Sequence, residues 1–175
     1  MDHQHDTTSY LITANPVFYN GKIYVVPTQE LFHNIPDGWL VCLDPTLEGD
    51  ITRTGIIWSY DGISSSSSTP AIADGLLYIA DYKGFLHCLD AESGKLLWKE
   101  DIGGPIWGSP LVADGKVYIG TGRRKLHVFE HAKECRPVSE ISLPDKMLVS
   151  PVAANGTLFI ETMSQIFAVE KQREK

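Results

Sequence analysis

A short pattern occurs four times in this 175-residue chain with the same internal spacing. Each copy has a proline, an Asn-Gly or Asp-Gly pair starting four residues later, and an aromatic residue eight residues after the proline. The copies begin at Pro16, Pro70, Pro110 and Pro151, which lie 54, 40 and 41 residues apart. Repeats of about 40 residues are typical of propeller blades and other repeat architectures. The chain is therefore expected to fold as an array of similar units.

Each unit has the pattern of several short strands. The Asn-Gly or Asp-Gly pair lies between two short apolar runs and predicts a hairpin with a type I′ turn, whose two central residues need positive φ. These turn residues are Asn20, Gly21, Asp74, Gly75, Asp114, Gly115, Asn155 and Gly156. A third run ends at an acidic residue in every unit, and a fourth run carries Trp58 or Trp98 in the first two units. Four antiparallel strands per unit predict an all-β propeller, either half of an eight-bladed ring or a four-bladed ring.

The spacing also sets the domain organisation. We expect a single propeller unit over 1–175, with repeats at about 12–62, 63–102, 103–143 and 144–175. The first repeat carries insertions at 28–36 and 46–54, and long loops on a rigid scaffold are common places for binding. The last repeat stops before an outer strand, and the segment from His5 to Leu11 falls where a strand could complete it.

Composition excludes several classes of partner. The net charge is -7, and no basic cluster exceeds Arg123-Arg124-Lys125, so we expect no nucleic-acid binding. No apolar run reaches the roughly 18 residues of a membrane helix, so no membrane insertion is expected. The N-terminal residues show no export signal, which leaves the compartment unknown. Cys42 and Cys88 share one repeat position and are expected to pack in the core, whereas Cys135 is expected to be the exposed thiol.

The segment from Leu89 to Trp98, with the sequence LDAESGKLLW, resembles the repeat of the pyrroloquinoline-quinone-like (PQQ-like) propeller family. The signature of that repeat is an Asp, a Thr-Gly or similar turn, and a Trp that packs between neighbouring blades. The likeness covers the second repeat fully, the first with enlarged loops, and the third and fourth in three strands only. In the third repeat the segment from His131 to Val138 replaces the turn, and the Trp is missing.

This resemblance implies one of two functions. Family members are either quinoprotein dehydrogenases, which use PQQ and calcium, or non-catalytic propellers such as the outer-membrane assembly lipoproteins, which are usually periplasmic or exported. The dehydrogenases share a vicinal Cys-Cys pair, which this sequence lacks. We therefore expect no cofactor, no catalytic residue and no metal site; PQQ and calcium belong only to the alternative.

The loops that enter each blade supply the candidate binding residues. In a propeller these loops converge on the axis, and here they contain Ser66, Ser67, Trp107 and Lys146. An exposed Trp beside a hydroxyl-rich loop could stack on a sugar or on an aromatic residue of a peptide. The alternative is that Trp107 only plugs the axis. His87 and His127 share one repeat position, which favours strand histidines with satisfied hydrogen bonds over metal ligands.

Three hypotheses follow from the sequence. The first is a non-catalytic scaffold that binds protein or carbohydrate. The second is a fragment or subunit of a PQQ-dependent quinoprotein oxidoreductase. The third is a halved propeller that assembles as a homodimer, because a half ring exposes the apolar faces of its first and last blades; the missing blades of a longer chain are the alternative partner for those faces.

Overall fold

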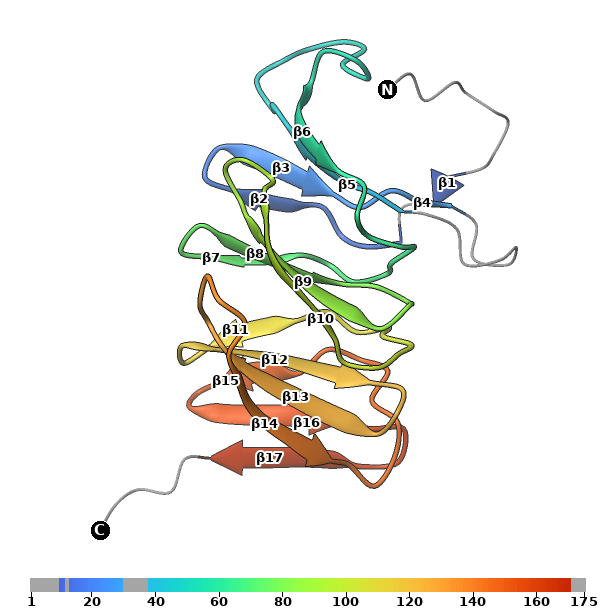
Figure 1. Cartoon of the computed structure of the whole chain (residues 1–175), viewed down its shortest axis with the longest axis vertical. Coiled ribbons are helices and arrows are strands. Elements are labelled where there is room, and N and C mark those ends of the chain that lie inside the picture. The colour runs from blue at the N-terminus through green and yellow to red at the C-terminus, as the bar shows by residue number, and fades with distance from the viewer. Residues whose placement is uncertain (1–9, 12, 30–37, 171–175) are drawn as a thin grey trace.

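The computed structural model describes residues 10–11, 13–29 and 38–170, and these residues form strands, turns and loops without a helix. Four antiparallel sheets follow one another in chain order and stack along the long axis of the molecule (Figure 1). Blade 1 contains β2 (Val17–Tyr19), β3 (Lys22–Val25), β5 (Leu40–Leu43) and β6 (Ile56–Tyr60). Blade 2 contains β7 (Ala71–Ala73), β8 (Leu76–Ala80), β9 (Phe85–Asp90) and β10 (Leu96–Asp101).

The other two blades repeat this order. Blade 3 contains β11 (Leu111–Ala113), β12 (Lys116–Thr121), β13 (Lys125–Glu130) and β14 (Pro137–Ser142). Blade 4 contains β15 (Val152–Ala154), β16 (Thr157–Glu161) and β17 (Ile166–Glu170). The predicted all-β propeller architecture is confirmed. Of the two ring alternatives, a closed ring of four blades is not what these residues form, because blades 1 and 4 lie at opposite ends of the stack (Figure 1).

The turn between the first two strands is the same in every blade. Asn20, Asp74, Asp114 and Asn155 have φ between 47° and 52°, and the glycine that follows each of them also has positive φ. Both central residues thus have the conformation of a type I′ turn, which matches the twist of the flanking strands. The local sequence therefore sets the pairing register, as in the pairs Ala73↔Leu76 and Ala113↔Lys116.

The N-terminal strand lies in an unexpected place. β1 (Tyr10–Leu11) pairs with β4 (Thr28–Gln29) at the blade 1 end of the stack. The expectation that this segment completes blade 4 is wrong for Tyr10 and Leu11, because the first insertion supplies a partner strand much closer in the chain. The remainder of the predicted clasp, and of the first insertion, lies outside the described residues.

Blade 3 has a fourth strand although it lacks the family turn and the Trp. β14 pairs with β13 through a register shift near Val128, at the position where β10 shifts against β9. Ser139 lies opposite Val128, just as Trp98 lies opposite Cys88. Strand pairing thus persists because it depends on the backbone, while the packing residue has changed.

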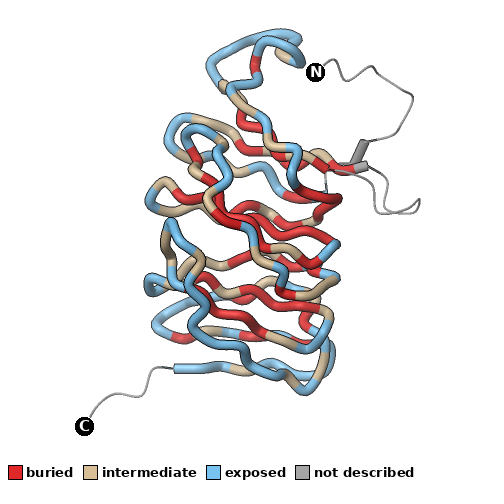
Figure 2. The backbone as a smooth tube through the Cα atoms, in the orientation of Figure 1, coloured by how far each residue is buried: buried red, intermediate tan, exposed pale blue. Residues whose placement is uncertain are grey.

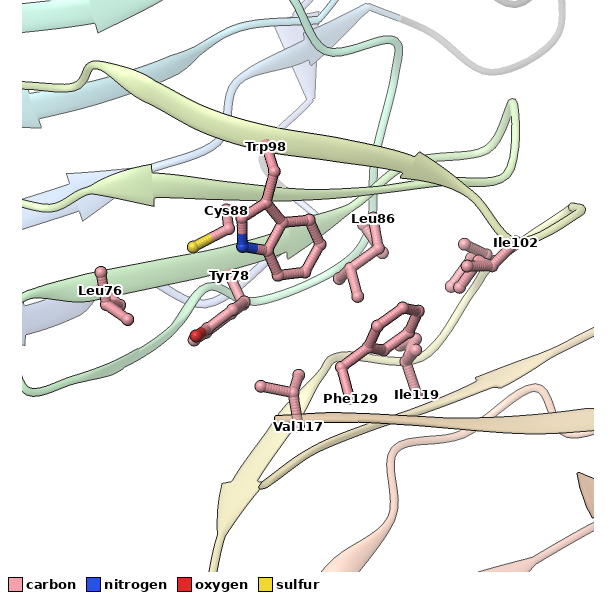
Figure 3. Packing of buried hydrophobic residues seen from close by; sticks show 11 residues of the cluster. Leu76, Tyr78, Leu86, Cys88, Trp98, Ile102, Val117, Ile119 and Phe129 are labelled. Carbon is pink, nitrogen blue, oxygen red and sulfur yellow. The ribbon is translucent and has the colours of Figure 1, made fainter. Parts of the chain in front are cut away.

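The core lies between the blades. In the largest cluster, side chains of blade 2 such as Tyr78, Leu86 and Trp98 face Val117 and Phe129 of blade 3 (Figure 3). Similar clusters join blade 1 to blade 2 and blade 3 to blade 4. Buried segments run through the middle of the stack, and exposed segments dominate its two ends (Figure 2).

Candidate binding site

A ladder of hydrogen bonds joins the blades where each first strand begins. The residues before the first three repeat prolines donate their backbone N–H to a hydroxyl of the next blade: Asn15 to Thr69 Oγ1 at 3.1 Å, Thr69 to Ser109 Oγ at 2.9 Å, and Ser109 to Ser150 Oγ at 2.7 Å. The sequence contained the signal, since Asn15, Thr69, Ser109 and Ser150 all precede the repeat proline. The ladder fixes the entry loops, and these loops carry the candidate residues.

Of the predicted residues, Ser66 belongs to this scaffold. Its hydroxyl donates to the carbonyl oxygen of Ala80 and accepts the backbone N–H of Ser68 at 3.0 Å, and the side chain is buried. Because both functions of the hydroxyl are used internally, Ser66 holds the loop in place and does not present a free group.

Ser67 and Trp107 come together on the surface. The Ser67 hydroxyl donates to the Trp107 carbonyl oxygen at 3.0 Å, and the Trp107 side chain remains 44% exposed. The ring of Tyr82 packs edge-on against the indole, with 4.7 Å between centroids and 65° between planes. The Tyr82 hydroxyl is buried and has no hydrogen-bond partner among the described residues. Sequence reasoning missed Tyr82, since no repeat pattern distinguishes it.

Lys146 is not part of this pair. It lies exposed in the loop that enters blade 4, where its carbonyl oxygen accepts the N–H of Met163 at 3.0 Å. No hydrogen bond or ion pair of the described residues joins it to Ser67 or Trp107. The structure therefore brings together a smaller candidate group, formed by Ser67, Trp107 and Tyr82.

Tryptophans of the fourth strands dock onto the next blade. Trp58 Nε1 donates to the Ala91 carbonyl oxygen at 3.2 Å, and Trp98 Nε1 donates to that of Ala132 at 3.1 Å. The altered turn of blade 3 thus still receives the Trp of blade 2. Between blades 3 and 4, where Ser139 takes the Trp position, Tyr118 lies in the wall of a cavity of about 640 Å³.

The two repeat histidines differ. His87 is fully buried; its Nδ1 contacts the Tyr60 hydroxyl at 3.0 Å and its Nε2 contacts Asp81 Oδ2 at 3.1 Å. Burial alone would raise the pKa of Asp81, but hydrogen bonds from His87, Phe85 N–H and Ser64 N–H together hold that pKa below its usual range. This arrangement agrees with a strand histidine whose hydrogen bonds are satisfied.

His127 has lost both partners. Glu100 takes the position of Tyr60 and Thr121 that of Asp81, so a groove of about 270 Å³ opens beside the His127 ring, and its Nε2 is buried without a hydrogen bond among the described residues. Burial, followed by Lys125, lowers the pKa of His127, against an opposing effect of Glu140 at 3.8 Å.

The cysteines are poor nucleophiles. Burial raises the pKa of the Cys88 thiol to about 12 and also raises that of Cys42. Cys135 is half-buried rather than fully exposed, with its Sγ 3.8 Å from Glu100 Oε2, and burial and this carboxylate raise its pKa too. Thiolate chemistry is therefore disfavoured at all three.

Two further features are absent from residues 10–11, 13–29 and 38–170. No group of three or more His, Cys, Asp or Glu side chains is arranged to hold a metal ion. No helix long and apolar enough to cross a membrane is found there.

Comparison with known sequences gives a consistent set of relatives. A family model described as outer membrane protein assembly factor BamB matches residues 36–136. The BamB protein of Yersinia pestis is 29% identical over 100 residues, which are 57% of this chain and 25% of that protein. A cytochrome c-dependent 1-butanol dehydrogenase of Thauera butanivorans is 43% identical over 49 residues, or 27% of this chain and 7% of that protein. The chain thus spans about a quarter of the length of the BamB relative.

Solved structures agree on the fold. The crystal structure of BamB from Moraxella catarrhalis superposes with a TM-score of 0.69 at 20% identity, over 91% of this chain and 47% of that one. The computationally designed Ika4 protein superposes with a TM-score of 0.65 at 10% identity, over 95% of this chain and 94% of that one.

Proposed function

Because the chain belongs to the family of the outer membrane protein assembly factor BamB, we propose that it is a non-catalytic propeller that binds polypeptide segments during outer-membrane protein assembly. The exposed side chain of Trp107 indicates where such a segment would bind. Tyr82 and Ser67 hold this indole at the surface, and rigid aromatic side chains are the commonest anchors of protein interfaces.

The site suits an extended or unfolded segment better than a polar small molecule. The Trp107 side chain offers apolar area, and the neighbouring Ser67 hydroxyl oxygen, whose hydrogen is donated to the Trp107 carbonyl oxygen, can accept a hydrogen bond at its edge. A segment of an outer-membrane β-barrel protein, in which apolar and polar residues alternate, presents both kinds of group. Carbohydrate stacking on the same indole is the competing binding mode.

The test is a titration with a urea-unfolded outer-membrane β-barrel polypeptide diluted into buffer, followed by calorimetry. Trp107→Ala is expected to weaken binding by about 2 kcal/mol, roughly thirtyfold, without changing the melting temperature. Val138→Ala, an exposed apolar residue of β14, is the matched control and should bind as the wild type does. Equal affinity in wild type and Trp107→Ala would refute the site, and tighter binding of oligosaccharides would favour the carbohydrate mode.

The quinoprotein alternative has one supporting observation, the short match to the butanol dehydrogenase. The sequence argues against a quinoprotein, because its cysteines at 42, 88 and 135 include no vicinal pair. We expect no oxidation of alcohols or sugars when the protein is supplied with PQQ, calcium and a dye acceptor. Turnover that requires PQQ would overturn the non-catalytic assignment. We propose in addition that the partners of this scaffold include a second copy of the chain.

A further inference from the structure

We propose that the free face of blade 4 docks on the free face of blade 1 of a second copy, so that two chains close one ring head to tail. This inference names the surfaces for the self-association proposed above. The blade interfaces inside the chain all use the same positions of the repeat.

The free face of blade 4 has the composition of a buried blade face. Val152, Phe159 and Ile166 lie on it with 55%, 39% and 70% of their surfaces exposed. Counted from the repeat glycine and the closing acid, Phe159 corresponds to Tyr78, and Ile166 corresponds to Leu86, both fully buried between blades 2 and 3. Several exposed apolar side chains at such positions are typical of an interaction site.

The free face of blade 1 is its counterpart. Phe18 is 69% exposed, and Ile23, Val25 and Leu43 are half-buried. The equivalent residues of blade 2, Ile72, Leu77, Ile79 and Leu89, pack against blade 1. Blade 1 therefore offers the surface that each later blade offers to its predecessor, and blade 4 offers the surface that receives it.

The hydrogen-bond ladder has complementary ends. The ladder starts at Asn15 and stops at Ser150, whose backbone N–H forms no hydrogen bond among the described residues. The Asn15 side chain stands at the repeat position of the acceptor hydroxyls of Thr69, Ser109 and Ser150. It also forms no hydrogen bond among the described residues. Ser150 N–H of one copy donating to Asn15 Oδ1 of the other continues the same ladder across each junction.

This array of blades superposes on 47% of the BamB chain from Moraxella catarrhalis, so two such arrays match roughly the extent of that chain. The array also superposes on 94% of the designed Ika4 protein. A head-to-tail contact closes into a ring when the rotation between the two copies is a half turn.

Light scattering on the purified chain tests the proposal. A mass of two chains is expected for the wild type and of one chain for Ile166→Glu, which places a carboxylate on the free face without altering a buried residue. Val138→Glu, on the rim of blade 3, is the control and should remain dimeric. A monomeric wild type, or a mass that grows beyond two chains with concentration, would overturn the closed ring.

Disulfide trapping determines the orientation. In a Cys135→Ser background, Asn15→Cys and Ser150→Cys chains are prepared separately and mixed under oxidising conditions. Head-to-tail docking predicts a disulfide between the two different chains, and little between identical ones. Efficient homodimers of Ser150→Cys would show tail-to-tail pairing and refute the proposal.

A second substitution separates association from folding. Glu161 lies on the blade 4 face where Ala80 and Gly120 stand in the preceding blades, so burial on docking costs the desolvation of a carboxylate. Glu161→Ala is expected to tighten the dimer, and a weaker dimer would contradict the docking. Trp107→Ala should stay dimeric, so a dimer that binds no barrel polypeptide would refute only the proposed function.

Discussion

At the scale of single residues, equivalent repeat positions have diverged in their hydrogen bonding. His87 has a phenol and a carboxylate in contact with its two ring nitrogens, whereas His127 Nε2 in the next blade has no hydrogen-bond partner among the described residues and its Nδ1 lies 3.8 Å from Glu140. The repeat itself supplies apolar alternatives at this position, since Val41 stands there in blade 1 and Phe167 in blade 4. A buried histidine with an unsatisfied ring nitrogen favours its neutral form, because burial penalises the charged form.

This difference predicts a pH dependence of stability. Folding lowers the pKa of His127. The contribution of the neutral His127 to the free energy of unfolding is therefore fully present above the unfolded pKa of about 6.5, and it is lost as the pH falls below that value. Between pH 7.5 and 5.5, the free energy of unfolding in urea should therefore fall more in the wild type than in His127→Phe. His131→Asn, which removes a histidine whose Nε2 lies 3.3 Å from the exposed Asp74 carboxylate, serves as the control; an unchanged pH dependence in His127→Phe would contradict the prediction.

At the scale of elements, each fourth strand serves the next blade as well as its own. The side chains of Trp58 in β6 and Trp98 in β10 donate hydrogen bonds to carbonyl oxygens of the next blade. The ring centroids of Tyr24 and Tyr78 lie 5.8 Å from those of Trp58 and Trp98, respectively. Blade 3 keeps the strand and the tyrosine, Tyr118, but has Ser139 in the Trp position. The interface between blades 3 and 4 accordingly leaves a cavity of about 640 Å³ beside Tyr118.

Restoring the missing side chain should strengthen that interface. Ser139→Trp is expected to raise stability by about 1 kcal/mol, because an indole there fills space between the blades as Trp98 does. For a chain of this size that corresponds to a melting temperature roughly 2–4 °C higher. Val138→Trp, the adjacent exposed position, should give no such gain. A lower melting temperature for Ser139→Trp, or a fully solvent-exposed fluorescence spectrum, would show that the position does not face the cavity.

At the scale of the whole molecule, the array has two unlike ends, and its stability is a sum over neighbouring blade interfaces. A head-to-tail dimer adds two more interfaces of the same kind. Association of folded chains then raises the apparent stability by mass action, so the melting temperature should increase with protein concentration. Ile166→Glu should remove that dependence. Calorimetric scans over a hundredfold range of concentration check both, and a constant wild-type melting temperature would argue against the added interfaces.

The sequence by itself determined the blades and their turns, because these depend on local chemistry: an Asn-Gly or Asp-Gly pair specifies the turn, and the turn sets the register of its two strands. Residue spacing also led to Ser67 and Trp107 as neighbours on the axial loops. The pairing of Tyr10 and Leu11 with β4, the unsatisfied Nε2 of His127 and the contact of Tyr82 with Trp107 required the tertiary structure. They join segments that lie apart in the chain, and no local pattern specifies which side chains meet across two blades. For the same reason, only the three-dimensional arrangement showed that the fourfold repeat leaves one matching apolar face free at each end.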